Sequence, residues 1–286
     1  MEPPDFGDLL EKNNDGGIRM RYTFRDKFGL LEGTPLSLEG KSAIITGGGS
    51  GMGQATSILF AKQGCAVGVC DLDEQGVAET IGIIKEKYPG AKAVPLIGDV
   101  TDHQKAKVLT DYFASQAKSV DALVTFAGIV ERMAFENITP EKWDRMIRIH
   151  LTGTYNWIHA VIPYMKKQNS GKIIAIGSNI GQIGCPDNAH YCAAKAGIAG
   201  LIKTIAQEFA AYHITANVVS PGTVHTGIVP GRTEEDAIER GKIVLLGRQA
   251  EPLEISFLCL LLASKAGDYI TGQQIGINGG EGIVGI

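Results

Sequence analysis

The chain has 286 residues, of which 44% are hydrophobic and 20% are charged, and its formal net charge is −4 at pH 7. This composition is typical of a globular protein, and the lack of a basic excess argues against nucleic acid as a partner. The N-terminus is acidic and polar, without a secretory signal, and the longest apolar run, near residues 255–263, is too short to span a membrane.

The number and spacing of the cysteines and histidines argue against disulfide bonds and metal sites. The five cysteines are scattered without CxxC spacing, so we expect reduced thiols in a cytoplasmic protein. The six histidines show no HxxxH or HExxH spacing, and we therefore expect no metal site.

The first 38 residues differ in composition from the rest of the chain. They contain Pro3-Pro4, Asn13-Asn14 and Gly16-Gly17, followed by a run of mixed charges. We expect an irregular N-terminal arm that lies on the body of the protein. An arm that reaches a neighbouring subunit or covers the active site is the alternative.

Residues 39–286 alternate between short β-branched runs and amphipathic stretches. The runs predict strands at 42–46, 66–71, 93–97, 122–125, 172–176, 215–219 and 274–277. The stretches between them predict helices at 52–63, 74–87, 102–117, 140–167, 189–211 and 252–263. This alternation predicts an α/β fold, a doubly wound parallel sheet of about seven strands with helices on both faces, in a single domain.

One irregular stretch, 223–249, interrupts the alternation. It contains Pro230-Gly231 and Gly241, and it follows the sixth expected strand. We expect this stretch, together with residues 179–190, to border the substrate, and we expect 223–249 to close as a lid that excludes water. The alternative is a surface excursion without a role in binding.

A glycine-rich turn follows the first expected strand. The pattern GxxxGxG fits at Gly47, Gly51 and Gly53, whereas GxGxxG does not, because position 52 is Met52. Glycines allow the backbone to approach a pyrophosphate at the N-terminus of the next helix. The turn, including Ser50 and Met52, is therefore expected to bind a dinucleotide.

Two carboxylates follow the next two strands. Asp71, with Leu72 behind it, is placed to accept hydrogen bonds from the adenosine ribose and to repel a 2′-phosphate. Ser50 supplies no cation for such a phosphate, so the expected cofactor is NAD rather than NADP. Asp99, followed by Val100, could hold the adenine amine, or it could be the N-cap of the following helix.

Tyr191 and Lys195 are four residues apart in an expected helix and therefore share one face. An ammonium beside a phenol favours the phenolate and lowers the phenol's pKa, which suits an acid/base group. The pair Tyr88 and Lys92 has the same spacing, but a Pro-Gly break there indicates a solvated turn. Ser178 precedes Tyr191 by thirteen residues and lacks the GxSxG context of a hydrolase nucleophile.

These features stand in the order and spacing of one known family. The sequence resembles a short-chain dehydrogenase/reductase from about residue 38 to about residue 280. The residues that carry the resemblance are Thr46, the glycines at 47–53, Asp99, Ala127-Gly128, Ser178, Tyr191, Lys195, Asn217 and Pro221-Gly222. The resemblance implies a Rossmann-type fold and hydride transfer between a nicotinamide and an alcohol or carbonyl group.

The resemblance also implies a role for each site residue. Tyr191 would be the general acid/base, Lys195 would hold the nicotinamide ribose and lower the pKa of Tyr191, and Ser178 would donate to the substrate oxygen. Further cofactor contacts would come from Phe126, Ala127, Gly128, Pro221, Gly222, Val224 and Thr226.

Two positions depart from the family pattern. Phe126 stands where relatives often have an asparagine that bonds to the cofactor. His150 stands where they commonly have the asparagine that holds a water in the proton path. His150 either replaces this relay, or is packed structurally, or marks a lost function.

The sequence therefore predicts an NAD(H)-dependent oxidoreductase that acts on a small secondary alcohol or ketone. The rival within the class is an NADPH-dependent 3-oxoacyl-thioester reductase, and a rival from another class is a catalytically weak NAD-binding scaffold or sensor. We expect a homo-oligomer, a dimer or tetramer, because the stretches 140–167 and 189–211 carry apolar residues on more than one face.

Overall fold

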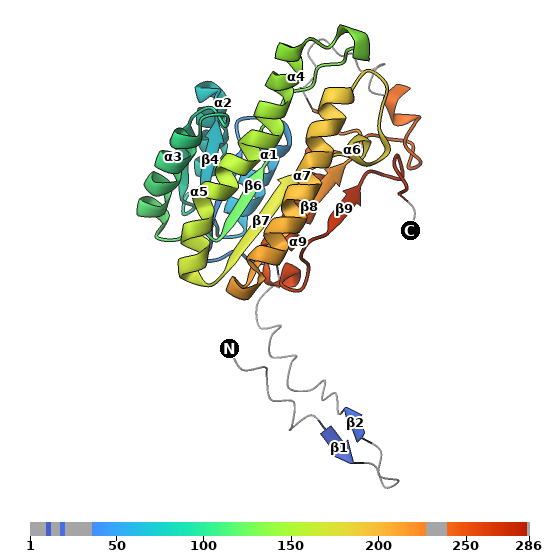
Figure 1. Cartoon of the computed structure of the whole chain (residues 1–286). Helices are drawn as coiled ribbons and strands as arrows, with labels where there is room; N and C mark the ends of the chain where they lie inside the picture. The colour runs from blue at the N-terminus through green and yellow to red at the C-terminus, as the bar shows by residue number, and fades with distance from the viewer. Residues whose placement is uncertain (1–9, 13–17, 21–35, 227–238, 285–286) are drawn as a thin grey trace. The chain divides into compact units, whose positions relative to one another are not determined.

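The structure is a computed structural model of the whole chain, and it describes residues 10–12, 18–20, 36–226 and 239–284 (Figure 1). The chain divides into two compact units, residues 1–35 and 36–286. In the first unit, β1 (Leu10–Lys12) and β2 (Ile18–Met20) pair antiparallel. The N-terminal arm, expected to be irregular, thus contains a short pair of strands.

The second unit is built on a parallel sheet of seven strands in the order β5-β4-β3-β6-β7-β8-β9. The chain runs outward through β3, β4 and β5, then returns to the other side of β3 for the remaining four strands. The order therefore reverses between β3 and β6, which is where such sheets bind ligands. The strands are β3 (Ser42–Thr46), β4 (Ala66–Asp71), β5 (Ala93–Ile97), β6 (Ala122–Thr125), β7 (Gly171–Ile176), β8 (Ile214–Pro221) and β9 (Gln274–Ile277).

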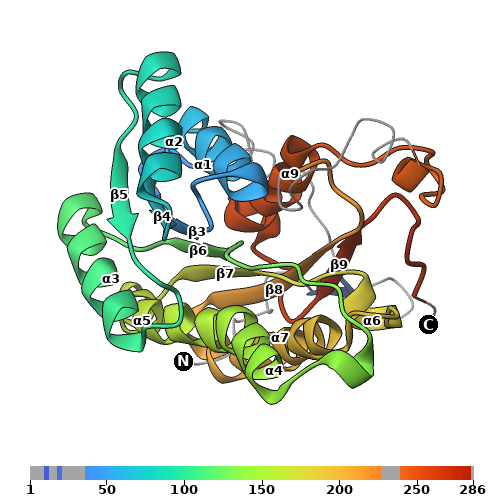
Figure 2. The ribbon, with the colours of Figure 1, turned by 90° about the horizontal axis from the view of Figure 1, so that it is seen from above.

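Helices cover both faces of this sheet, as Figure 2 shows from above. One face carries α1 (Gly51–Lys62), α2 (Glu74–Lys87) and α9 (Pro252–Ala263). The other carries α3 (His103–Ala117), α4 (Pro140–Ile147), α5 (Gly153–Gln168) and α7 (Ala189–Glu208). The shorter elements are α6 (Ile180–Ile183) and the helical turns η3 (Phe135–Asn137), η5 (Ala210–Tyr212) and η6 (Lys265–Gly267). None of the helices in the described residues is long and apolar enough to cross a membrane.

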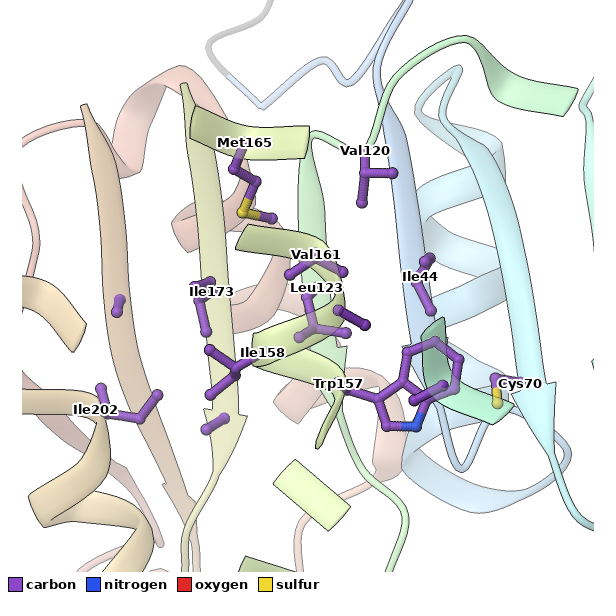
Figure 3. Packing of buried hydrophobic residues seen from close by; sticks show 14 of the residues in the cluster. Ile44, Cys70, Val120, Leu123, Trp157, Ile158, Val161, Met165, Ile173 and Ile202 are labelled. Carbon is purple, nitrogen blue, oxygen red and sulfur yellow. The ribbon is translucent and has the colours of Figure 1, made fainter. Parts of the chain in front are cut away.

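Alternate strand residues enter two separate cores, one on each face of the sheet. Ile44 packs on the side of α3, α5 and α7 with Leu123 and Trp157 (Figure 3). Its neighbour Ile45 belongs to the core under α1, α2 and α9, together with Phe60. Because both faces are covered, the strands are mostly apolar, which is why the sequence predicted them well.

The sequence prediction of one continuous helix over 140–167 is wrong in its middle. The α-helix α4 ends at Ile147, residues Arg148–Thr152 wind as a π-helix, and α5 begins at Gly153. His150 lies at the centre of the π-helical turn and is buried. Such turns change the direction in which side chains point and occur frequently at functional sites.

Candidate active site

Two neighbouring cavities open at the carboxyl edge of the sheet. The larger has a volume of about 550 Å³ and the smaller about 300 Å³. They share Met52, Phe126, Gly128, Ile129 and Thr226 in their linings, so a single bound molecule can extend from one into the other.

The larger cavity collects the residues that the sequence proposed for the dinucleotide. Those that line it are Gly47, Ser50, Gly51, Met52, Gly53, Asp71, Leu72, Asp99, Val100, Phe126, Ala127, Gly128 and Thr226. Its lining also includes Gly98, Ile129, Arg145 and Ile149, which the sequence analysis did not single out. Gly98 directly follows β5, and Arg145 lies on α4, but no sequence motif marks either residue.

Two positions of the glycine-rich turn require glycine because the backbone packs closely there. Gly47 has φ +70°, and a Cβ there would lie 2.7 Å from the amide nitrogen of Ala127. A Cβ on Gly53 would lie 2.0 Å from the carbonyl oxygen of Gly47. Side chains at 47 and 53 would therefore force the turn away from β6 and from its own helix. The remaining space in front of α1 fits a pyrophosphate at the helix N-terminus.

Asp71 is tied to that turn. Its Oδ2 accepts a hydrogen bond of 3.0 Å from the amide of Gly49, and its Oδ1 accepts one of 3.1 Å from the amide of Asp73. Each carboxylate oxygen can accept a further hydrogen bond, and Asp71 lines the larger cavity, which fits ribose hydroxyls. The only cation lining the larger cavity in the described part of the chain is Arg145, and it lies 3.7 Å from Glu131.

Asp99 is not the N-cap of α3, so that alternative is wrong. The cap is Asp102, whose carboxylate accepts a hydrogen bond of 2.9 Å from the amide of Lys105. Asp99 instead accepts a hydrogen bond of 2.8 Å from Thr101 and lines the larger cavity with an exposed carboxylate. The chain turns between Asp99 and the helix, and sequence spacing alone did not distinguish the two acids.

The smaller cavity brings together the four residues proposed for catalysis. Ser178 follows β7, Tyr191 and Lys195 lie on α7, and His150 comes from the π-helical turn. The expected nicotinamide contacts Pro221, Gly222, Val224 and Thr226 line the same cavity after β8. Ser178 is buried, and its hydroxyl lies 3.3 Å from Oδ1 of Asn179.

The electrostatics of Tyr191 differ from the sequence expectation. Burial raises the pKa of Tyr191 to about 12, and this outweighs the hydrogen bond with Ser178, which lowers it. The ammonium of Lys195 lies 5.6 Å from the Tyr191 ring centre and donates to the carbonyl of Ile176 at 2.7 Å. Burial also lowers the pKa of Lys195 to about 7, so the lysine is only partly charged at neutral pH. The expected lowering of the Tyr191 pKa is therefore wrong for the chain alone.

His150 is held beside Tyr191 by the loop after β6. Its Nε2 lies 2.8 Å from the carbonyl oxygen and 3.1 Å from the amide nitrogen of Ile129, and a neutral ring uses one of these bonds. The ring packs edge-on to Tyr191, with 5.1 Å between centroids. A Cβ on Gly128 would lie 2.3 Å from the imidazole Cε1, so this position must be glycine.

The environment of His150 keeps its ring neutral. Burial, followed by the charge of Lys195, lowers the pKa of His150 to about 3. Its Nδ1 is buried and has no partner among the described residues. A proton relay through His150 would therefore run through the neutral imidazole rather than through an imidazolium.

Glu281 and Arg132 line the smaller cavity but lie outside the stretches that the sequence analysis expected to border the substrate. Glu281, after β9, accepts hydrogen bonds from the amide and hydroxyl of Thr223 at 2.6 and 3.0 Å. Arg132, Cys185, Asn188, Arg240 and Ile243 also line this cavity. One signal could have found Glu281, because β9 is parallel to β8 and ends at the same edge.

The stretch 223–249 borders the smaller cavity at both of its described ends. Thr223, Val224 and Thr226 line it from one end, and Arg240 and Ile243 from the other. The expectation that the stretch borders the substrate site is consistent with this position. Pro230-Gly231 lies outside the described residues, and closure as a lid stays a prediction.

A family model described as short chain dehydrogenase matches residues 41–237. The chain belongs to the short-chain dehydrogenase family. It is therefore an oxidoreductase, and this family binds a nicotinamide cofactor, which the glycine turn and Asp71 fit. Within the family, the chain is 37% identical over 248 residues to the 3-oxoacyl-(acyl-carrier-protein) reductase FabG of Thermotoga maritima. That match covers 86% of this chain and 99% of the relative.

Further short-chain dehydrogenases agree with this match. The chain is 34% identical over 240 residues to FabG of Staphylococcus epidermidis, covering 84% of this chain and 98% of that protein. The crystal structure of levodione reductase superimposes with a TM-score of 0.82 at 26% identity, over 85% of this chain and 98% of the other. The crystal structure of a dehydrogenase/reductase from Sinorhizobium meliloti superimposes with a TM-score of 0.81 at 27% identity, over 91% of this chain and 100% of the other.

Proposed function

We propose that the chain is an NAD(H)-dependent oxidoreductase that transfers hydride between the nicotinamide and a ketone or secondary alcohol. The observation that carries this proposal is that Ser178, Tyr191 and Lys195 line one cavity, and that this cavity shares lining residues with the neighbouring glycine-lined one. We infer that the protein acts in the cytoplasm, since its five cysteines are free thiols.

The side chains supply proton transfer and positioning, while the nicotinamide, when bound, supplies or accepts the hydride. With its pKa raised to about 12, Tyr191 is a phenol at neutral pH and donates its proton to a carbonyl oxygen in the reductive direction. The Ser178 hydroxyl holds the same oxygen, and Lys195, when charged, offsets the charge left on the phenolate. His150 packs against the Tyr191 ring and orients it.

Tyrosine chemistry is tested by Tyr191→Phe. We expect reduction of ketones to fall by about 10²- to 10⁴-fold, because the acid is removed and the ring packing is kept. Tyr88→Phe is the matched control, since Tyr88 and Lys92 have the same spacing but do not line either cavity. A panel of ketones and secondary alcohols, followed by NADH absorbance, makes the measurement. Equal rates in both variants would contradict the role of Tyr191 as the acid, and no turnover by the unmodified chain would support the scaffold or sensor alternative.

Asp71 supports NAD as the cofactor, because its carboxylate would face the 2′-phosphate of NADP. We expect kcat/KM with NADH to exceed that with NADPH, and Asp71→Ala to narrow the ratio by about tenfold or more as the repulsion is lost. Asp73→Ala, which removes the neighbouring N-cap carboxylate of α2, serves as the control. Equal efficiency with NADPH in the unmodified chain would contradict the proposal.

The second candidate is an NADPH-dependent 3-oxoacyl-thioester reductase. The names of the relatives that are 33–37% identical favour this substrate, which is itself a ketone. Asp71 argues against the NADPH part of this candidate. Comparing 3-oxobutyryl N-acetylcysteamine thioester with simple ketones, each with both cofactors, separates the two candidates.

A further inference from the structure

Two arginines that line the smaller cavity, the exposed Arg132 and the half-buried Arg240, have no counter-ion among the described residues. Arg132 belongs to the loop after β6, and Arg240 to the described end of the stretch 223–249. Neither forms a hydrogen bond or ion pair with any residue that the structure describes. Neighbouring arginines do: Arg145 lies 3.7 Å from Glu131, and Arg248 binds both carboxylate oxygens of Glu254 at 2.7 Å.

Arg240 is half-buried, but one of its donor atoms is fully buried, which makes the lack of a partner costly. Its Nε is buried and lacks a hydrogen-bond acceptor among the described residues. A buried donor of this kind retains its desolvation cost until an acceptor binds. Since a guanidinium cannot lose its proton in a protein, the charge is permanent. The cavity is therefore built to receive an acceptor, preferably an anionic one.

The one carboxylate in this cavity's lining does not fill that role. Glu281 uses both oxygens to accept hydrogen bonds from Thr223, which fixes it to the turn after β8. No ion pair joins Glu281 to Arg132 or Arg240 within the described residues. The described residues that line the cavity thus include two guanidiniums and the partly charged Lys195 but one carboxylate, which gives this lining an excess of positive charge.

We propose that the substrate carries an anionic group, a carboxylate or a phosphate, which Arg132 and Arg240 bind while Ser178 and Tyr191 hold the carbonyl oxygen. The assignment of the carbonyl rests on the proposed hydride transfer. Guanidinium groups match the planar geometry of carboxylates and phosphates and form charge-assisted hydrogen bonds with them. A cavity of about 300 Å³ suits a small keto acid or keto phosphate.

Paired ligands that differ only in charge test the proposal. The chain is titrated calorimetrically with acetoacetate against acetoacetamide, and with dihydroxyacetone phosphate against dihydroxyacetone. NAD in its oxidised form is present, so that no ketone is reduced. We expect one charged member to bind at least about tenfold more tightly than its neutral partner. The pair that shows the preference identifies the anion as carboxylate or phosphate.

Substitution of each arginine tests whether these residues cause the preference for the charged ligand. Arg132→Gln and Arg240→Gln are each expected to reduce the charged-to-neutral ratio by about tenfold, and lysine at either position to restore part of it. Arg148→Gln is the matched control, because Arg148 is exposed, lines neither cavity and has no partner among the described residues. It is expected to leave the ratio unchanged.

The outcomes separate this inference from the proposed function. A ratio near one in the unmodified chain, including no detectable binding of either charged compound, overturns the anion site. So does a preference that survives both glutamine substitutions, or tightest binding by the neutral N-acetylcysteamine thioester. Anion binding without turnover of any ketone would count against the hydride transfer alone. Turnover without charge preference would count against the anion site alone.

Discussion

At the residue scale, the positions of the catalytic and cofactor-binding side chains were predictable where these residues come soon after the end of a strand. Asp71, Ser178 and Tyr191 each stand beside such an end or in the next helix, and all line the two cavities. Their protonation was not predictable, because it depends on burial by distant segments. The pKa of His150 depends on the loop that contains Ile129 and on Lys195, neither of which is near it in sequence.

The buried neutral state of His150 predicts a stability that falls in acid. Its pKa in the folded chain, about 3, lies below the unfolded value of 6.5, so the unfolded chain binds the proton first. This contribution is present above pH 6.5 and is lost as the pH falls toward 3. Between about pH 7.5 and pH 5, the free energy of unfolding should fall by about 2 kcal/mol more in the unmodified chain than in His150→Asn.

Denaturant unfolding at the two pH values measures this difference, with His225→Asn, which replaces an exposed histidine, as the control. Equal acid sensitivity of the unmodified chain and His150→Asn would show that the ring is solvated. Because of the same low pKa, a relay through His150 would add no ionisation near neutral pH to the rate profile. We now expect the profiles of kcat against pH to have one shape in the unmodified chain and in His150→Asn near neutrality.

At the element scale, the strands and most helices have the bounds that hydrophobic periodicity predicts. The failure at 148–152 has a physical reason, since a π-helical turn has no residue pattern distinct from an α-helix. The π-helical turn buries the His150 ring against Gly128, where any larger residue would clash with it. The turn therefore depends on a contact with a loop that is distant in the sequence. Local propensity could not predict a turn whose side chain packs against another loop.

Substitutions at Asp102 and Asp99, just before α3, test which of these two acids caps the helix and which contributes to cofactor binding. Asp102→Ala removes the N-cap hydrogen bond to Lys105 and should lower the free energy of unfolding by about 1 kcal/mol. Asp99→Ala should change stability less, because that carboxylate is exposed and caps no helix, and should weaken NADH binding instead. Thermal melts and NADH titration of both variants make the comparison. The reverse pattern, with Asp99→Ala the more destabilising, would restore Asp99 as the cap.

At the scale of the whole molecule, the parallel sheet with helices on both faces was predictable from the strand-helix alternation, but association between chains does not follow from it. The sequence argument for an oligomer used apolar residues of the stretches 140–167 and 189–211. Two of them, Ile158 and Ile198, are buried in the chain's own core and therefore do not support an interface between chains. Trp143 remains 37% exposed, and Tyr155, also in this region, is 45% exposed.

These exposed aromatic side chains support the prediction that the chain forms a dimer or tetramer through the helices α4, α5 and α7. Large aromatic groups contribute strongly to interfaces because each buries much apolar surface. A carboxylate at such a position would have to lose its hydration, so Trp143→Glu and Tyr155→Glu should shift the assembly toward monomer. Tyr269→Glu is the control, because Tyr269 is fully exposed beside η6 and outside these helices. Light scattering at micromolar concentration gives the masses. A monomeric mass for the unmodified chain would contradict the prediction, and unchanged assembly of both glutamate variants would place the interface elsewhere.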